Sequence, residues 1–121
     1  MKIALTTEEA NLDSALDPRF GRCNYFLLVE TDDRSYTAHA NPAAGASGGA
    51  GPQAAQFIAE QGAEAVISGD FGPNAFRALT AAGMKLYKAP VKPVADLLDA
   101  LQAGALEEVE APSGPSHKGM R

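Results

Sequence analysis

The chain has 121 residues, 45% of them hydrophobic, and a formal net charge of −5 from 10 basic and 15 acidic residues. This length accommodates one compact domain and little more. The acidic balance argues against a nucleic-acid partner, because proteins that bind DNA or RNA usually carry an excess of basic residues. No segment reaches the roughly 18 apolar residues of a membrane span, and no export signal opens the chain. We therefore expect a cytoplasmic protein without a membrane partner.

Three strands are predicted in the first 40 residues. Residues 2–6 and 25–31 are short apolar runs. In residues 35–40 polar and apolar side chains alternate, as they do in a strand. The segment between the first two runs is polar and is predicted to be a loop. A turn at Asp32 and Asp33 separates the second strand from the third, so the three strands are expected to pair in an antiparallel fashion.

Helices and strands alternate in the remainder of the chain. Helices are predicted from Pro52 to about Gly62, from Pro73 to Gly83 and over residues 94–103, because Pro is favoured in the first helical turn and Gly just after the last. Apolar residues recur at helical spacing in each of them. The segments 65–68 and 85–88 are predicted to be strands, and parallel pairing through right-handed crossovers follows from the alternation.

The predicted order is β-β-β-α-β-α-β-α. It indicates an α/β fold with a mixed five-stranded sheet of ribonuclease H-like topology and helices packed on it. We expect residues 1–110 to form a single α/β domain. Residues 111–121 are rich in Gly, Pro and Ser and are expected to form a disordered tail.

Three loops are predicted to meet at one edge of the sheet. Ligands of open α/β sheets bind beyond the carboxyl ends of the parallel strands, where residues 17–23, 41–52 and 69–74 are expected to lie. Two of these loops are rich in Gly and lead into helices, whose first turns offer unpaired N–H groups and partial positive charge. Arg19 and Arg22 add positive charge. The edge therefore suits a compact anion, although a nucleotide is disfavoured by the lack of a phosphate-loop or dinucleotide motif.

Five short motifs in these regions resemble a known family. They are residues 2–4 (Lys-Ile-Ala), 18–22 (Pro-Arg-Phe-Gly-Arg), 41–42 (Asn-Pro), the Gly-rich run into 51–55 (Gly-Pro-Gln-Ala-Ala), and 72–76 (Gly-Pro-Asn-Ala-Phe). In these motifs the chain resembles the dinitrogenase iron–molybdenum cofactor biosynthesis and carrier family over nearly all of residues 1–110. That family includes cofactor carriers of nitrogenase assembly and a protein that holds a molybdenum–copper–sulfide cluster without covalent links.

The resemblance implies a non-catalytic carrier of a small anionic metal–sulfur cluster. The cargo would be a molybdenum–copper–sulfide cluster or a related iron–sulfur or iron–molybdenum cluster, exchanged with donor or acceptor proteins. We expect backbone N–H groups and arginines to hold it, with the single cysteine, Cys23, as a candidate metal ligand. The other candidate cluster-binding residues are Arg19, Phe20, Gly21, Arg22, Ser47, Gly48, Gly49, Gly51, Gly72 and Asn74.

Plainer interpretations stay open at this point. Arg19 and Arg22 could be solvated or could pair with Asp13 and Asp17, and Cys23 could be a small buried hydrophobic residue. A ribonuclease H-like nuclease is disfavoured, because the first strand has no carboxylate to hold metal ions. The alternative function is a regulatory or interaction module whose pocket is empty or senses an anion.

Overall fold

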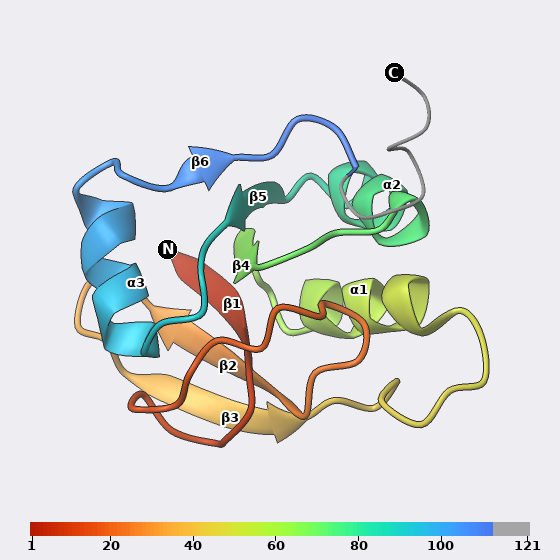
Figure 1. Ribbon diagram of the computed structural model, residues 1–121, viewed down its shortest axis with the longest axis horizontal. Coiled ribbons are helices and arrows are strands. Elements are labelled where there is room, and N and C mark those ends of the chain that lie inside the picture. Colours follow the sequence, from red (N-terminus) through yellow and green to blue (C-terminus); the bar gives the residue numbers. More distant parts are fainter. Residues whose placement is uncertain (113–121) are drawn as a thin grey trace.

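The computed structural model describes residues 1–112. Six strands form one mixed sheet, and three helices pack on it (Figure 1). The strands are β1 (Lys2–Thr7), β2 (Tyr25–Glu30), β3 (Tyr36–Ala40), β4 (Ala65–Ser68), β5 (Lys85–Lys88) and β6 (Glu107–Glu108). The helices are α1 (Ala50–Glu60), α2 (Pro73–Ala81) and α3 (Val94–Gln102). The predicted tail over 111–121 falls almost wholly outside the described residues.

The strand order in the sheet is β3-β2-β1-β4-β5-β6. The pairs β1–β2 and β2–β3 are antiparallel, whereas β1–β4 and β4–β5 are parallel. These pairings confirm a mixed α/β sheet with an antiparallel edge and parallel centre, while the ribonuclease H-like label stays a prediction. The carboxyl ends of β1 and β4 therefore lie side by side at one edge.

The predicted count of five strands is wrong, because β6 adds a sixth. It pairs with β5 in an antiparallel fashion, with Glu108 opposite Tyr87 and Glu107 opposite Lys88. Both glutamates are exposed, so they lack the alternation of apolar and polar residues that marks a strand in a sequence. The chain is held there by backbone pairing and by the next residue, whose N–H donates to the carbonyl of Leu86.

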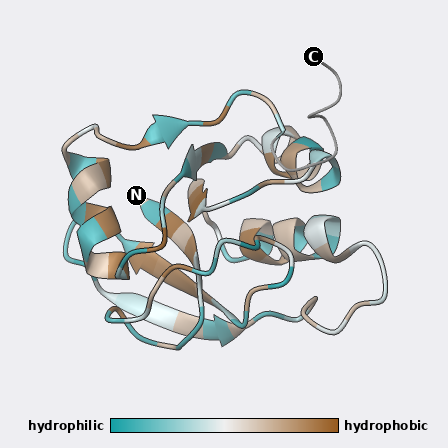
Figure 2. Ribbon diagram, viewed as in Figure 1, coloured by the Kyte–Doolittle hydropathy of each residue, from teal (hydrophilic) through white to brown (hydrophobic). Residues whose placement is uncertain are grey.

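Alternate residues of the strands build two cores, one on each face of the sheet. Ala4 and Val66 face a core with Ala54 and Ile58 of α1 and Leu79 of α2. The neighbouring strand residues face the second core, whose buried members from β1, β4 and α3 are Ile3, Leu5, Ala65, Ile67, Val94, Leu97 and Leu98. Figure 2 shows β2 and β4 as mostly hydrophobic, whereas β6 at the edge of the sheet is hydrophilic. Because α1 and α2 cover the same face, their first turns reach the same edge of the molecule.

The helix α1 begins at Ala50, two residues before the predicted start at Pro52. Gly49 precedes it with a φ of 71°, in the left-handed region that favours glycine. Pro52 still lies within the first turn, where a missing N–H breaks no helical hydrogen bond. Among residues 1–112 no helix is long and apolar enough to cross a membrane.

Candidate functional site

The three loops meet at the predicted edge around an open cleft of about 420 Å³. Most of the predicted site residues line it, namely Arg19, Phe20, Gly21, Arg22, Gly49, Gly51, Gly72 and Asn74. The remaining lining residues are Ala50, Pro52, Asp70, Pro73 and Ala75, and none of them was predicted as a site residue. Ser47 and Gly48 lie outside this lining, on the exposed outer part of the loop before α1.

Two helix N-termini form one wall of the cleft. Neither α1 nor α2 has a side-chain cap on its first turn, and neither has an acidic residue there. The first-turn residues Ala50 and Gly51 of α1, and Asn74 and Ala75 of α2, all line the cleft. Because N–H groups in a first turn have no partner within the helix, they are donors available to an anion, and the helix dipoles add partial positive charge.

Close contacts between glycines and backbone hold the three loops together. A Cβ built on Gly21 would lie 2.9 Å from the backbone nitrogen of Gly51, and one on Gly69 would lie 2.6 Å from Cβ of Pro18. The N–H of Asp70 donates to the carbonyl of Pro18 at 2.8 Å. The cleft therefore keeps its shape because side chains are missing at two positions where loops touch.

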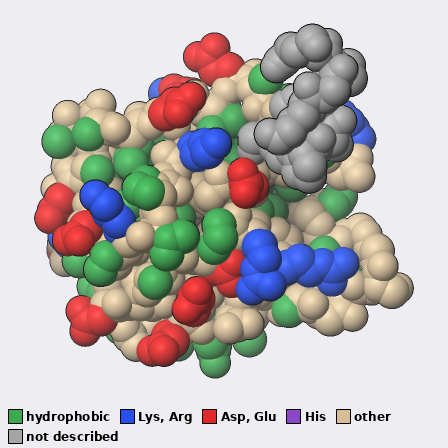
Figure 3. All heavy atoms as spheres, in the orientation of Figure 1, with side chains coloured by type: hydrophobic (Ala, Val, Ile, Leu, Met, Phe, Trp, Pro, Cys, Tyr) green, Lys and Arg blue, Asp and Glu red, His purple; other side chains and the backbone are tan. Residues whose placement is uncertain are grey.

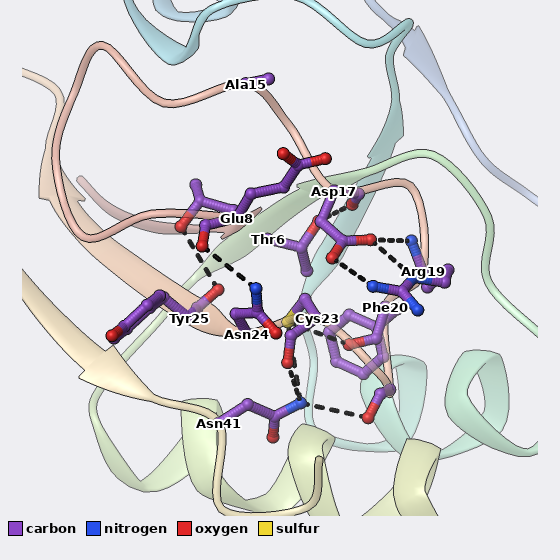
Figure 4. Close-up of polar contacts among 12 residues, drawn as sticks. Thr6, Glu8, Ala15, Asp17, Arg19, Phe20, Cys23, Asn24, Tyr25 and Asn41 are labelled. Carbon is purple, nitrogen blue, oxygen red and sulfur yellow. Dashed lines mark hydrogen bonds and ion pairs between the residues drawn. The ribbon is translucent and has the colours of Figure 1, made fainter.

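Arg19 is paired with Asp17, as one of the plainer interpretations of the sequence had it. Its Nε and Nη2 donate to the two carboxylate oxygens at 3.0 and 2.8 Å, and its backbone N–H donates to Oδ1 at 3.0 Å (Figure 4). The Asp17 side chain is 1% exposed and that of Arg19 is 63% exposed. Burial alone would raise the pKa of Asp17, but the hydrogen bonds and charge of Arg19 outweigh it and lower that pKa below its usual range.

Arg22 contacts the facing loop rather than a carboxylate. Its Nη1 donates to the carbonyls of Ala46 at 2.5 Å and Ala44 at 3.4 Å. Figure 3 shows Lys and Arg side chains gathered in a row over the loop that crosses in front of α1. Arg22 thus ties residues 17–23 to the Gly-rich segment, and it also contributes positive charge to the cleft.

Asn41 is a structural residue of the site that the sequence analysis named only as part of the Asn-Pro motif. Its side-chain N–H₂ donates to the carbonyls of Gly21 and Cys23 at 3.1 and 2.9 Å, and its Oδ1 accepts the N–H of Ala43 at 2.9 Å. The side chain is buried, and Figure 4 shows its amide pointing toward Cys23. The Asn-Pro pair at a strand end was the available signal, because such an Asn often bonds the backbone two residues on.

Cys23 is fully buried and is absent from the cleft lining. Its Sγ lies 3.5 Å from the carbonyl of Phe20 and 3.7 Å from Nδ2 of Asn41. Burial, with a contribution from the charge of Asp17, raises the pKa of the thiol to about 12. These contacts are those of a small core residue. Within residues 1–112 no three His, Cys, Asp or Glu side chains come together in a way that could hold a metal ion.

Cys23 is accordingly expected to resist thiol reagents in the native protein. With a pKa of about 12, only roughly one thiol in ten thousand is ionised at pH 8, and the sulfur has no exposed surface. We expect labelling by iodoacetamide at pH 8 to be at least about a hundredfold slower than in urea-unfolded protein, as followed by mass spectrometry. Equal rates in the native and unfolded states would contradict the buried placement.

Together these features define a small α/β protein with an open cleft lined by two helix N-termini and two arginines. The family model described as dinitrogenase iron-molybdenum cofactor matches residues 1–104, so the chain belongs to that family. An uncharacterised protein of Methanocaldococcus jannaschii is 31% identical over 113 residues, which cover 91% of this chain and 92% of that protein.

Two solved structures combine this fold with substantial sequence identity. The apo form of the orange protein from Desulfovibrio gigas is 35% identical, with a TM-score of 0.90 over 93% of this chain and 96% of its own. The NMR structure of a Thermotoga protein, described as a candidate NifB protein, is 32% identical, with a TM-score of 0.81 over 93% and 97%. The family expected from the sequence motifs is thereby confirmed.

Proposed function

We propose that this protein binds and carries a small anionic metal–sulfur cluster in the cleft between the first turns of α1 and α2. The observation that supports it most is that two uncapped helix N-termini, without acidic first-turn residues, line one cleft beside two arginines. The model of the family to which the chain belongs carries the description dinitrogenase iron-molybdenum cofactor. A molybdenum–copper–sulfide or iron–molybdenum type of cluster is the cargo that we propose.

The chemistry of the lining fits a cluster that brings its own sulfides. The donors facing the cleft are backbone N–H groups and guanidinium groups, which bind anions and do not ligate metal cations. The volume of about 420 Å³ lies within the roughly 300–1,000 Å³ of small-molecule sites. The first-turn N–H groups would donate to cluster sulfides, and Arg19 and Arg22 would offset the negative charge.

We propose carriage rather than catalysis. Asp70 is the one carboxylate in the lining of the described cleft, which contains neither His nor Cys. General acid–base or nucleophilic catalysis requires a nucleophile or base held by a partner group, and this lining supplies no such pair. We further propose that the protein works in the cytoplasm and exchanges the cluster with a donor or acceptor protein.

Anaerobic reconstitution tests the proposal. The protein is incubated with tetrathiomolybdate and copper, or with iron and sulfide, and then passed through a desalting column. We expect one mixture to give new charge-transfer absorption bands and a fixed metal-to-protein ratio. Colourless protein free of metal from both mixtures would refute carriage and favour the regulatory or interaction module.

Replacing both Arg19 and Arg22 with Ala is expected to weaken cluster retention by about tenfold or more, because two neutralising charges are lost at the cleft. The dependence of retention on salt concentration should also become shallower. The matched control replaces Lys2 and Lys85 with Ala. These residues begin β1 and β5 at the opposite edge of the sheet, and their loss changes the net charge equally. Unchanged affinity and salt dependence in the arginine variant would refute the role of the arginines.

A further inference from the structure

The charged side chains around the cleft balance one another. Asp17 accepts two side-chain hydrogen bonds from Arg19 at 3.0 and 2.8 Å, so its buried carboxylate offsets part of the charge of Arg19. Asp70 lines the cleft together with Arg22, and its side chain is exposed. Two arginines and two carboxylates thus lie in or directly behind the cleft wall, and the formal charge of these four side chains is zero.

The position of Asp70 is fixed by the backbone. Its N–H donates to the carbonyl of Pro18, and it pairs with Arg19 in a short parallel bridge between the loops. Gly69, just before it, packs against Pro18 too closely for a side chain. The backbone that carries the carboxylate is thus held in the wall of the cleft, and no ion pair to Asp70 is found within residues 1–112.

A carboxylate is an unexpected group in a cleft built from helix N-termini and arginines. Without it, the same donors would suit phosphate, sulfate or molybdate, which concentrate charge on small oxygens and bind at helix N-termini. A negative charge in the wall repels such anions. A sulfide-rich cluster spreads its charge over larger atoms, so its charge lies on average farther from the carboxylate and is repelled less strongly.

We propose that Asp70 is a specificity-determining residue that excludes small oxyanions from the cleft while leaving it open to sulfide-rich metal clusters. The carboxylate acts by repulsion of the wrong ligand, which is a common route to selectivity. This inference rests on the proposed function and deepens it by naming what the cleft rejects. The cleft is then a site for anions of low charge density.

The test compares molybdate with the cluster formed from tetrathiomolybdate and copper. Binding of molybdate is measured by equilibrium dialysis with molybdenum analysis, and retention of the cluster by its absorption after desalting. In Asp70→Asn we expect the affinity for molybdate to rise by about tenfold and cluster retention to change by less than about threefold. The matched control is Asp32→Asn, which makes the same charge change at an exposed turn after β2 and should leave both quantities as in the wild type.

The outcomes separate this inference from the proposed function. If the wild type retains the cluster but Asp70→Asn gains no affinity for molybdate, the role of Asp70 is wrong and carriage stands. Loss of the cluster in Asp70→Asn, with the fold intact by circular dichroism, also overturns it, because the carboxylate would then bind the cluster. If no mixture yields retained cluster in any variant, the proposed function and this inference fail together.

Discussion

Gly69→Ala is expected to lower the free energy of unfolding by about 2–3 kcal/mol, the upper part of the range for overpacking a rigid, buried site. The added Cβ would lie 2.6 Å from Cβ and 2.7 Å from Cα of Pro18. Neither atom is the end of a flexible side chain, so the two loops must move apart. The hydrogen bond from the N–H of Asp70 to the carbonyl of Pro18 would be strained by the same movement. Urea unfolding followed by circular dichroism measures the loss.

Gly72→Ala is the matched control in the same loop. A Cβ at Gly72 would meet nothing within 4 Å, and its φ of −68° is open to any residue. We expect its unfolding free energy to stay within about 0.5 kcal/mol of the wild type or to rise slightly, because Ala restricts the unfolded chain. Equal losses in the two variants would show that the contact between Gly69 and Pro18 is not what the mutation disturbs.

The sequence predicts the core elements because local and long-range signals agree there. The apolar runs that became β1, β2 and β4 are short and bounded by polar residues or glycines, so they have few alternatives. These signals do not predict the strand β6. Glu107 and Glu108 are exposed edge residues, placed by pairing with β5, and nothing in their own side chains favours a strand.

The convergence of three loops was predictable from topology, and the partners of the side chains were not. Glycine patterns and parallel strands bring the loops to one edge whatever the details. The same sequence left it open whether Arg19 pairs with Asp13, with Asp17 or with solvent. Only the backbone path of the loop puts Asp17 beneath the guanidinium and directs Arg22 onto the carbonyls of residues 44 and 46.

The depth of a residue is likewise set by packing rather than by the local motif. Cys23 directly follows the motif that supplies Phe20, Gly21 and Arg22 to the cleft, which made it a candidate ligand. The chain turns inward at that point, and the cysteine enters the core beside Phe20. Ser47 and Gly48 lie instead at the exposed side of the loop before α1, outside the lining of the cleft.

Asp17→Asn is expected to lower the free energy of unfolding at pH 7 by about 1–3 kcal/mol. The amide keeps the shape and one acceptor, but its N–H₂ would face the Nη2 of Arg19, so two donors meet where an ion pair stood. The backbone bonds of Asp17 to Thr6 are untouched and keep the loop in place. The control is Asp13→Asn, an exposed residue of the same loop, which should change stability by less than about 0.5 kcal/mol.

The pH dependence of the Asp17→Asn effect gives the sharper readout. Because the native pKa of Asp17 lies below its usual value, its ionisation stabilises the folded state at any pH above the unfolded pKa of about 3.9. That contribution is lost as the pH falls through the native pKa, where the wild type becomes protonated as well. Urea unfolding at pH 7, 5 and 3 should therefore show a full difference between wild type and variant at the first two values and a smaller one at the third. A difference that is the same at all three would mean that packing, and not the charge beneath Arg19, is what Asp17 contributes.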